Sequence, residues 1–132
     1  DYCDNIEVCY EQPHLYLRGC DPTHEWLITS RLDNDDILLP EFVSTIHAEF
    51  ATTKEVIDVE YKKIKYKQLI KYPSLRPRPN SPYLSLVEPR GGDIMTALGR
   101  PHTVMPDLFE ARKLPVVLAY QIIHDRNVSN KI

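Results

Sequence analysis

An apolar segment that ends in a cluster of acids is the feature that most constrains the fold of this chain. Residues 26–30 read WLITS, a run rich in β-branched and aromatic side chains, which is typical of a β-strand covered on both faces. Three carboxylates follow at Asp33, Asp35 and Asp36, with Asn34 between them, and apolar residues then resume at once. The pattern predicts a buried strand followed by a polar turn that either is solvated or holds a cation.

A helix is predicted directly after the acids, over residues 40–51. Pro40 suits the first turn of a helix, and Glu41 complements the positive end of the helix dipole. The apolar residues that recur with a period of about 3.6 are Phe42, Val43, Ile46 and Phe50. His47 lies among them and is expected to be a partly buried structural histidine rather than a ligand.

The rest of the chain predicts further strands. Residues 55–67 alternate in polarity, and a slip of phase at Lys62 and Lys63 indicates a bulge or tight turn, in one bent strand or between two strands. Residues 72–82 are dense in proline and are expected to form a loop. The later segments are a strand over 83–88, a short helical turn or strand over 93–99, and a buried strand over 115–123. The predicted fold class is mixed α/β around one sheet.

Composition limits the class of protein. A length of 132 residues suits a single domain over 1–132, in which residues 1–24 form an irregular lead-in. The net charge of −3 and the lack of a basic stripe argue against nucleic acid as a partner. No apolar run approaches the roughly 20 residues of a membrane span, so no transmembrane segment is expected. With no secretory signal visible, a cytoplasmic protein is expected, and the first residue, Asp1, indicates a piece of a longer chain.

The three cysteines, Cys3, Cys9 and Cys20, do not form a disulfide pattern, and ordinary thiols in a reducing compartment are the favoured interpretation. A zinc site that adds His14 and His24 is the sharper alternative. It is disfavoured because the chain has no Cys-x-x-Cys pair.

The acids at residues 33–36 stand where open α/β sheets bind ligands, beyond the carboxyl end of a strand. Carboxylates suit hard cations, and Mg²⁺ is usually held by one or two carboxylates together with substrate phosphates, which points to a nucleotide diphosphate. The alternative is a charged turn that caps the following helix. A calcium loop of the EF-hand type is excluded because Ile37 or Leu38 stands where that loop requires glycine.

Four separated segments also resemble a known family. LDNDDILLPEFV resembles the Asp-x-Asp motif and following helix of family-2-type glycosyltransferases with the GT-A fold. More narrowly, WLITSRLDNDD, SPYLSLVEP, MTALGRPHTVM and QIIHDRNVSN resemble, in this order over residues 25–130, a bacterial group of rhamnosyltransferases. The resemblance implies a GT-A-like mixed sheet with flanking helices, incomplete at its N-terminus. The chain departs from the pattern because it has no counterpart of the earlier βαβ portion and no Trp shortly before QIIHDRN.

This resemblance implies metal-dependent transfer of a sugar from a nucleotide-sugar donor to a polysaccharide or lipid-linked acceptor, with Mn²⁺ or Mg²⁺ as cofactor. Asp33 would lie near the sugar or ribose, and Asn34 would belong with Arg31, Asp33 and Asp35 to the residues that bind the donor and its diphosphate. Asp35 and Asp36 would bind the ion that holds the diphosphate, and His124, which follows the last predicted strand, would complete the metal site.

Other polar residues are candidates for contacts with the donor or acceptor. Arg31 is expected to donate a charge-assisted hydrogen bond to phosphate, or else to pair with the adjacent acids. An inverting transferase needs a general base, for which Glu88 at the end of the 83–88 strand is the first candidate and His102 the second. The alternative for Glu88 is an exposed strand end. Arg76 and Arg78 are candidates to contact the acceptor or the diphosphate.

Two rival functions stay open. One is a non-catalytic fragment of a degenerate transferase that binds a sugar or a protein, and the other is a metal-dependent phosphohydrolase. A sheet edge left exposed by missing strands predicts in addition that two chains associate as a homo-oligomer.

Overall fold

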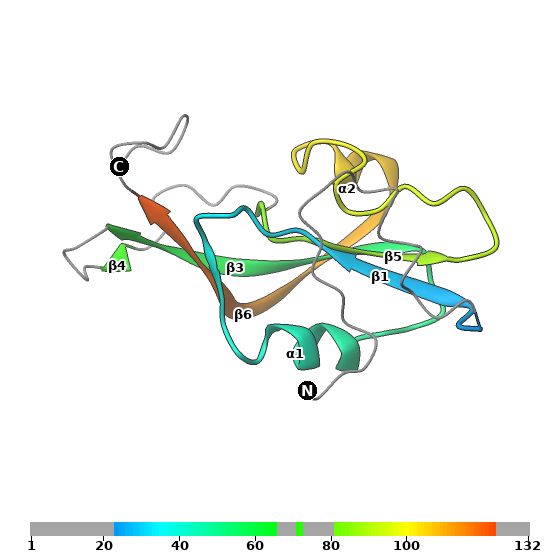
Figure 1. Ribbon diagram of the computed structural model, residues 1–132, viewed down its shortest axis with the longest axis horizontal. Helices are drawn as coiled ribbons and strands as arrows, with labels where there is room; N and C mark the ends of the chain where they lie inside the picture. Colours follow the sequence, from blue (N-terminus) through cyan, green and yellow to red (C-terminus); the bar gives the residue numbers. More distant parts are fainter. Residues whose placement is uncertain (1–22, 66–70, 73–80, 124–132) are drawn as a thin grey trace.

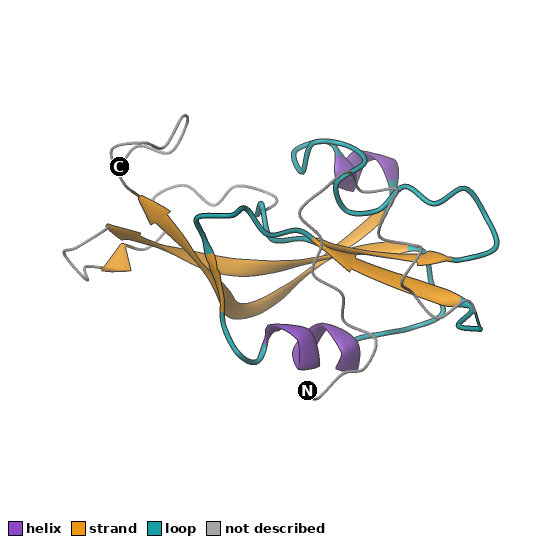
Figure 2. Cartoon of the chain, viewed as in Figure 1, coloured by secondary structure: helices purple, strands orange, loops and turns teal. Residues whose placement is uncertain are grey.

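The computed structural model describes residues 23–65, 71–72 and 81–123, which form a mixed sheet with two short helices (Figures 1 and 2). In chain order the elements are β1 (Trp26–Ser30), β2 (Ile37–Leu38), α1 (Phe42–Ala48), β3 (Glu55–Lys65), β4 (Lys71–Tyr72), β5 (Ser85–Pro89), α2 (Met105–Leu108) and β6 (Glu110–Ile123). The mixed α/β class predicted from the sequence is confirmed. No helix in this described part is long and apolar enough to cross a membrane.

The sheet has the strand order β1-β5-β3-β6-β2, and β4 pairs with β3 outside this path. β1 and β3 are each antiparallel to β5, and β6 is parallel to β3. β1, β3 and β6 therefore run in the same direction. The C-terminal ends of β1 and β6 therefore point the same way, while His124 lies outside the described residues.

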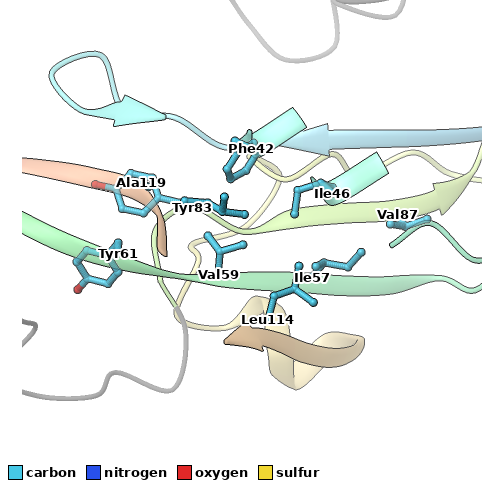
Figure 3. Packing of buried hydrophobic residues seen from close by; sticks show 10 residues of the cluster. Phe42, Ile46, Ile57, Val59, Tyr61, Tyr83, Val87, Leu114 and Ala119 are labelled. Carbon is cyan, nitrogen blue, oxygen red and sulfur yellow. The ribbon is translucent and has the colours of Figure 1, made fainter. Parts of the chain in front are cut away.

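The two helices lie on opposite sides of the sheet, each over its own apolar cluster (Figure 1). Side chains of a strand alternate between its faces, so neighbours on β3 and β5 divide between the clusters. The α1 side holds Phe42, Ile46, Ile57, Val59, Tyr61, Tyr83, Val87, Leu114, Leu118 and Ala119 (Figure 3). The α2 side holds Val56, Leu84, Leu86, Ala97 and Met105. The sheet thus separates two cores.

β1 spans the predicted residues, and the prediction that it is covered on both faces is confirmed in part. Leu27 is its one buried residue, and Ser30 is exposed. On the face opposite the α1-side core, Thr29 Oγ1 accepts the N–H of Ala97 at 2.8 Å. The apolar composition of β1 reflects packing of Trp26 and Ile28 on the α1-side core.

The predicted helix is confirmed but shorter, because Pro40 and Glu41 precede its first turn. Phe42 and Ile46 are its buried residues. The prediction that His47 is partly buried is wrong, because this side chain is exposed.

β3 is one continuous strand, and its irregularity lies earlier than the predicted slip at Lys62 and Lys63. Val59 pairs with Leu114 of β6, but the next residue, Glu60, pairs with Val117. The register of the two strands therefore shifts between Val59 and Glu60. The extra residues belong to β6 and include Pro115, which has no N–H for a ladder bond.

The other segments agree with the sequence to different degrees. The strand predicted over 83–88 is present as β5, displaced toward its C-terminus, and the strand predicted over 115–123 is the second half of β6. The prediction of a helical turn or strand over 93–99 is wrong, because these residues form irregular loop and turns. The predicted loop falls mainly on residues 73–80, outside the described residues.

Candidate functional site

The acids of residues 33–36 form a tight turn between β1 and β2. The backbone N–H of Asp36 donates to the carbonyl oxygen of Asp33 at 3.2 Å, which closes the turn. The next helix begins at Phe42, and Glu41 occupies its N-cap position without a side-chain capping bond to the described residues. The alternative in which the acids cap this helix is therefore wrong, although the prediction of a charged turn is confirmed.

Asp36 is held at both of its carboxylate oxygens. Oδ2 accepts a hydrogen bond from the Tyr83 hydroxyl at 2.6 Å, and Oδ1 accepts one from the backbone N–H of Ile122 at 2.9 Å. Burial raises the pKa of Asp36, and the negative charges of Asp35 and Asp33 add to this, while the two hydrogen bonds oppose it. The carboxylate joins the acidic turn to two segments remote in sequence.

Tyr83 is fully buried in the α1-side core, which raises the pKa of its hydroxyl well above the usual range; the adjacent Asp36 carboxylate adds to the shift. The hydroxyl therefore stays protonated and acts as a hydrogen-bond donor. The sequence predicts Tyr83 as the first residue of the strand over 83–88 but gives no indication of its contact with Asp36. No local pattern signals a bond between residues 47 positions apart.

Asp33, Asn34 and Asp35 form the outer part of the turn. Asn34 and Asp35 are exposed, and the Asp33 side chain is 42% exposed. The Arg31 guanidinium lies 3.6 Å from Asp33 Oδ1, so the predicted pairing of Arg31 with an adjacent acid is present. The acidic turn thus presents carboxylate and amide oxygens, with the Arg31 guanidinium beside Asp33.

Glu88, the first candidate for a general base, is fully buried, so the alternative of an exposed strand end is wrong. Its Oε1 accepts the backbone N–H of Met95 and its Oε2 that of Thr96, each at 2.9 Å. The adjacent N–H, of Ala97, donates to Thr29 Oγ1 at 2.8 Å. The carboxylate fastens the loop of residues 93–99 onto β5.

The structure does not bring Glu88 together with Asp36. Glu88 lies on the α2 side of β5 with Leu84 and Leu86, whereas Tyr83, the partner of Asp36, lies in the core on the α1 side. His102, the second candidate, is half-buried in the loop that precedes α2. Glu88 and Asp36 are therefore on different sides of the sheet.

Several predicted site residues lie outside the described residues: His124, Arg76, Arg78, Cys3, Cys9, Cys20 and His14. Within residues 23–65, 71–72 and 81–123, no three His, Cys, Asp or Glu side chains form a group that could hold a metal ion. The described part of the acidic turn accordingly offers two neighbouring carboxylates, Asp35 and Asp36, rather than a full metal-binding set.

Comparison of the chain with models of known protein families, with curated proteins and with solved structures gives no match.

Proposed function

We propose that this chain is the carboxyl-terminal part of a GT-A-like glycosyltransferase domain, similar to the rhamnosyltransferase group, that acts in the cytoplasm. In this proposal the acidic turn binds the diphosphate of a nucleotide sugar through Mn²⁺ or Mg²⁺, and the acceptor is a polysaccharide or lipid-linked glycan. One observation carries the proposal. Asp36 of the LDNDD segment is hydrogen-bonded to Tyr83 of the SPYLSLVEP segment and to Ile122 of the QIIHDRNVSN segment, so three segments of the resemblance meet at one carboxylate.

The donor atoms of the acidic turn fit a hard divalent cation. Each Asp36 oxygen accepts one hydrogen bond and keeps a second lone pair, and the Asp35 carboxylate is adjacent and exposed. Two carboxylates are the usual protein contribution to an Mg²⁺ ion that also binds phosphate oxygens. When bound, the ion supplies Lewis-acid stabilisation of the negative charge that develops on a leaving diphosphate.

The other residues of the turn have roles that follow from their position. Asp33 and Asn34 would accept hydrogen bonds from sugar or ribose hydroxyls. Arg31 would exchange its ion pair with Asp33 for a charge-assisted bond to phosphate. His124 is the further metal ligand in this proposal.

A non-catalytic function, in which the chain binds a sugar or a protein without turnover, is the second candidate. The observation that favours it is Glu88, whose two carboxylate oxygens both hold the 93–99 loop on the far side of the sheet from Asp36. A general base must reach the acceptor hydroxyl directly or through one water.

Thermal unfolding of this chain with Mn²⁺ and uridine diphosphate tests donor binding. We expect the melting temperature to rise, because a ligand at 100 times its dissociation constant stabilises the folded state by about 2.7 kcal/mol. The rise should disappear in Asp35→Ala and Asp36→Ala and persist in Asp93→Ala, which removes an exposed carboxylate far along the chain from the turn. No rise in the wild-type chain, or an equal rise in all variants, contradicts the proposal.

A panel of nucleotide sugars, assayed with and without glycan acceptors, separates the three functions. A transferase releases nucleoside diphosphate faster when acceptor is present, and the sugar appears on the acceptor. A phosphohydrolase releases phosphate or nucleotide regardless of acceptor, and a binding fragment releases nothing.

A further inference from the structure

The hydroxyl of Tyr83 is a buried donor directed at one oxygen of Asp36. The separation of 2.6 Å is in the range of strong hydrogen bonds between a hydroxyl and a carboxylate. The N–H of Ile122 donates to the other oxygen from the end of β6. Rotation of the Asp36 carboxylate would break both bonds, so its plane is fixed by two groups outside the acidic turn.

Tyr83 is itself fixed at its ring and at its backbone. The ring packs edge-on against Tyr61, with 5.5 Å between the ring centroids, and both rings belong to the core in Figure 3. The Tyr83 N–H donates to the Ser81 hydroxyl oxygen at 3.1 Å, and Ser81 in turn donates its hydroxyl and its N–H to the buried carboxylate of Asp58 at 2.5 and 2.8 Å. The donor on Asp36 is therefore anchored to β3.

Metal-binding carboxylates depend on such partners. A hydrogen bond to a ligand fixes its orientation before the ion arrives, and removal of the partner typically weakens metal binding about 10–100-fold. Asp36 has two such partners, and the Tyr83 hydroxyl is the one that a side-chain substitution removes.

We propose that Tyr83 is a positioning residue whose hydroxyl, with the Ile122 N–H, holds Asp36 in the orientation that binds the divalent cation. The inference rests on the proposed function, because it assigns Asp36 to the cation. The opposing interpretation is that the Tyr83–Asp36 bond fastens the turn to the core and has no effect on ion binding.

Titration of the chain with Mn²⁺, followed by the electron paramagnetic resonance signal of the free ion, separates these interpretations. The variants are Tyr83→Phe, Tyr61→Phe, Asp35→Asn and Asp36→Asn. Tyr61→Phe is the matched control, because it removes a hydroxyl from the neighbouring ring of the same core. The melting temperature of each metal-free variant reports the structural contribution separately.

We expect Tyr83→Phe to weaken Mn²⁺ binding about 10–100-fold and Tyr61→Phe to leave it within about twofold of the wild type. If Asp36→Asn abolishes binding while Tyr83→Phe lowers only the melting temperature, the inference about Tyr83 is overturned and the proposed function stands. If the wild-type chain binds no Mn²⁺ with or without uridine diphosphate, both are overturned.

Should Tyr83→Phe fail to fold, the wild-type chain provides the test. Under Mg²⁺ titration followed by nuclear magnetic resonance, the Ile122 amide and Tyr83 ring signals should shift and saturate together, because both groups contact the ligating carboxylate. Signals that do not move while Mg²⁺ binds would overturn the inference.

Discussion

Glu88 and Thr96 are joined by a buried hydrogen bond in which the carboxylate Oε2 accepts the backbone N–H at 2.9 Å. Thr96 has a φ of 63°, the left-handed conformation that costs a residue with a β-carbon roughly 1–2 kcal/mol. The neighbouring N–H of Met95 donates to the other oxygen of the same carboxylate. A buried charge thus holds the loop in a conformation that its sequence does not favour.

Glu88→Gln should destabilise the protein. One of the two amide donors then faces an NH₂ group instead of an oxygen, and loss of a hydrogen bond to a charged group costs about 1.5–3 kcal/mol. Urea denaturation measures this change in the free energy of unfolding. Glu110→Gln, at an exposed position, is the control and should stay within about 0.5 kcal/mol. Unchanged stability together with lost sugar transfer would instead favour the role of general base.

Phe42→Ala should remove much of the support that α1 gives to the sheet. The side chain is 1% exposed within the α1-side core, and truncation of a buried Phe costs about 3–5 kcal/mol. The neighbouring Val43 is 37% exposed, and Val43→Ala should change the free energy of unfolding by less than about 1 kcal/mol. Similar losses in both variants would mean that α1 does not pack on the sheet through Phe42.

Arg112→Gln should weaken the junction of α1, β3 and β6. The guanidinium contacts Glu49 Oε2 at 2.6 Å, the Glu49 carbonyl at 2.7 Å and Glu55 Oε1 at 3.0 Å. Because the Arg112 side chain is 38% exposed and solvent screens the pairs, we expect a loss of about 1 kcal/mol that shrinks in high salt. Arg100→Gln, whose guanidinium bonds the carbonyl of Gly99 on the surface, is the control. If the loss of stability does not change with salt concentration, it arises from packing of the aliphatic part of the Arg112 side chain rather than from its ion pairs.

Asp58 should make the stability of the protein depend on pH. Burial raises its pKa above the ordinary 3.8, although hydrogen bonds from Ser81 and Val59 oppose the shift. The Asp58 carboxylate therefore binds a proton more tightly in the folded state than in the unfolded state. The contribution of Asp58 to the free energy of unfolding falls as the pH rises from 3.8 through the folded pKa and is constant above it.

The difference in stability between the wild type and Asp58→Asn, measured in urea from about pH 4 to pH 7, should accordingly decrease as the pH rises. Titration of the Asp58 carboxyl carbon by nuclear magnetic resonance gives the pKa directly. A midpoint below 3.8, or a difference that grows with pH, would contradict the prediction.

Features that depend on neighbouring residues were predictable from the sequence. The strand of residues 26–30 follows from its β-branched and aromatic side chains, the helix from the spacing of Phe42 and Ile46, and the turn from clustered Asp and Asn. The acidic turn was also singled out as the candidate site on this basis.

Features that depend on pairing across the sheet were not predictable. The irregularity predicted at Lys62 and Lys63 lies instead at Glu60, where the extra residues belong to the partner strand β6 and include Pro115. The 93–99 loop is held by the Glu88 carboxylate. Pro115 is remote in sequence from Glu60. Glu88 lies only seven and eight residues before Met95 and Thr96, but its burial depends on the packing of the sheet.

The sequence alone therefore determined where the chain places its clustered carboxylates, because the tendency to form a turn there is local. The role of each acid depends instead on the folded arrangement of the strands. In the folded chain Glu88 is buried on the α2 side of the sheet, and the Tyr83 hydroxyl and the Ile122 N–H donate to the two oxygens of Asp36. The physical reason is that burial and hydrogen bonding of a carboxylate are set by strand order and register, which bring together residues far apart in the chain.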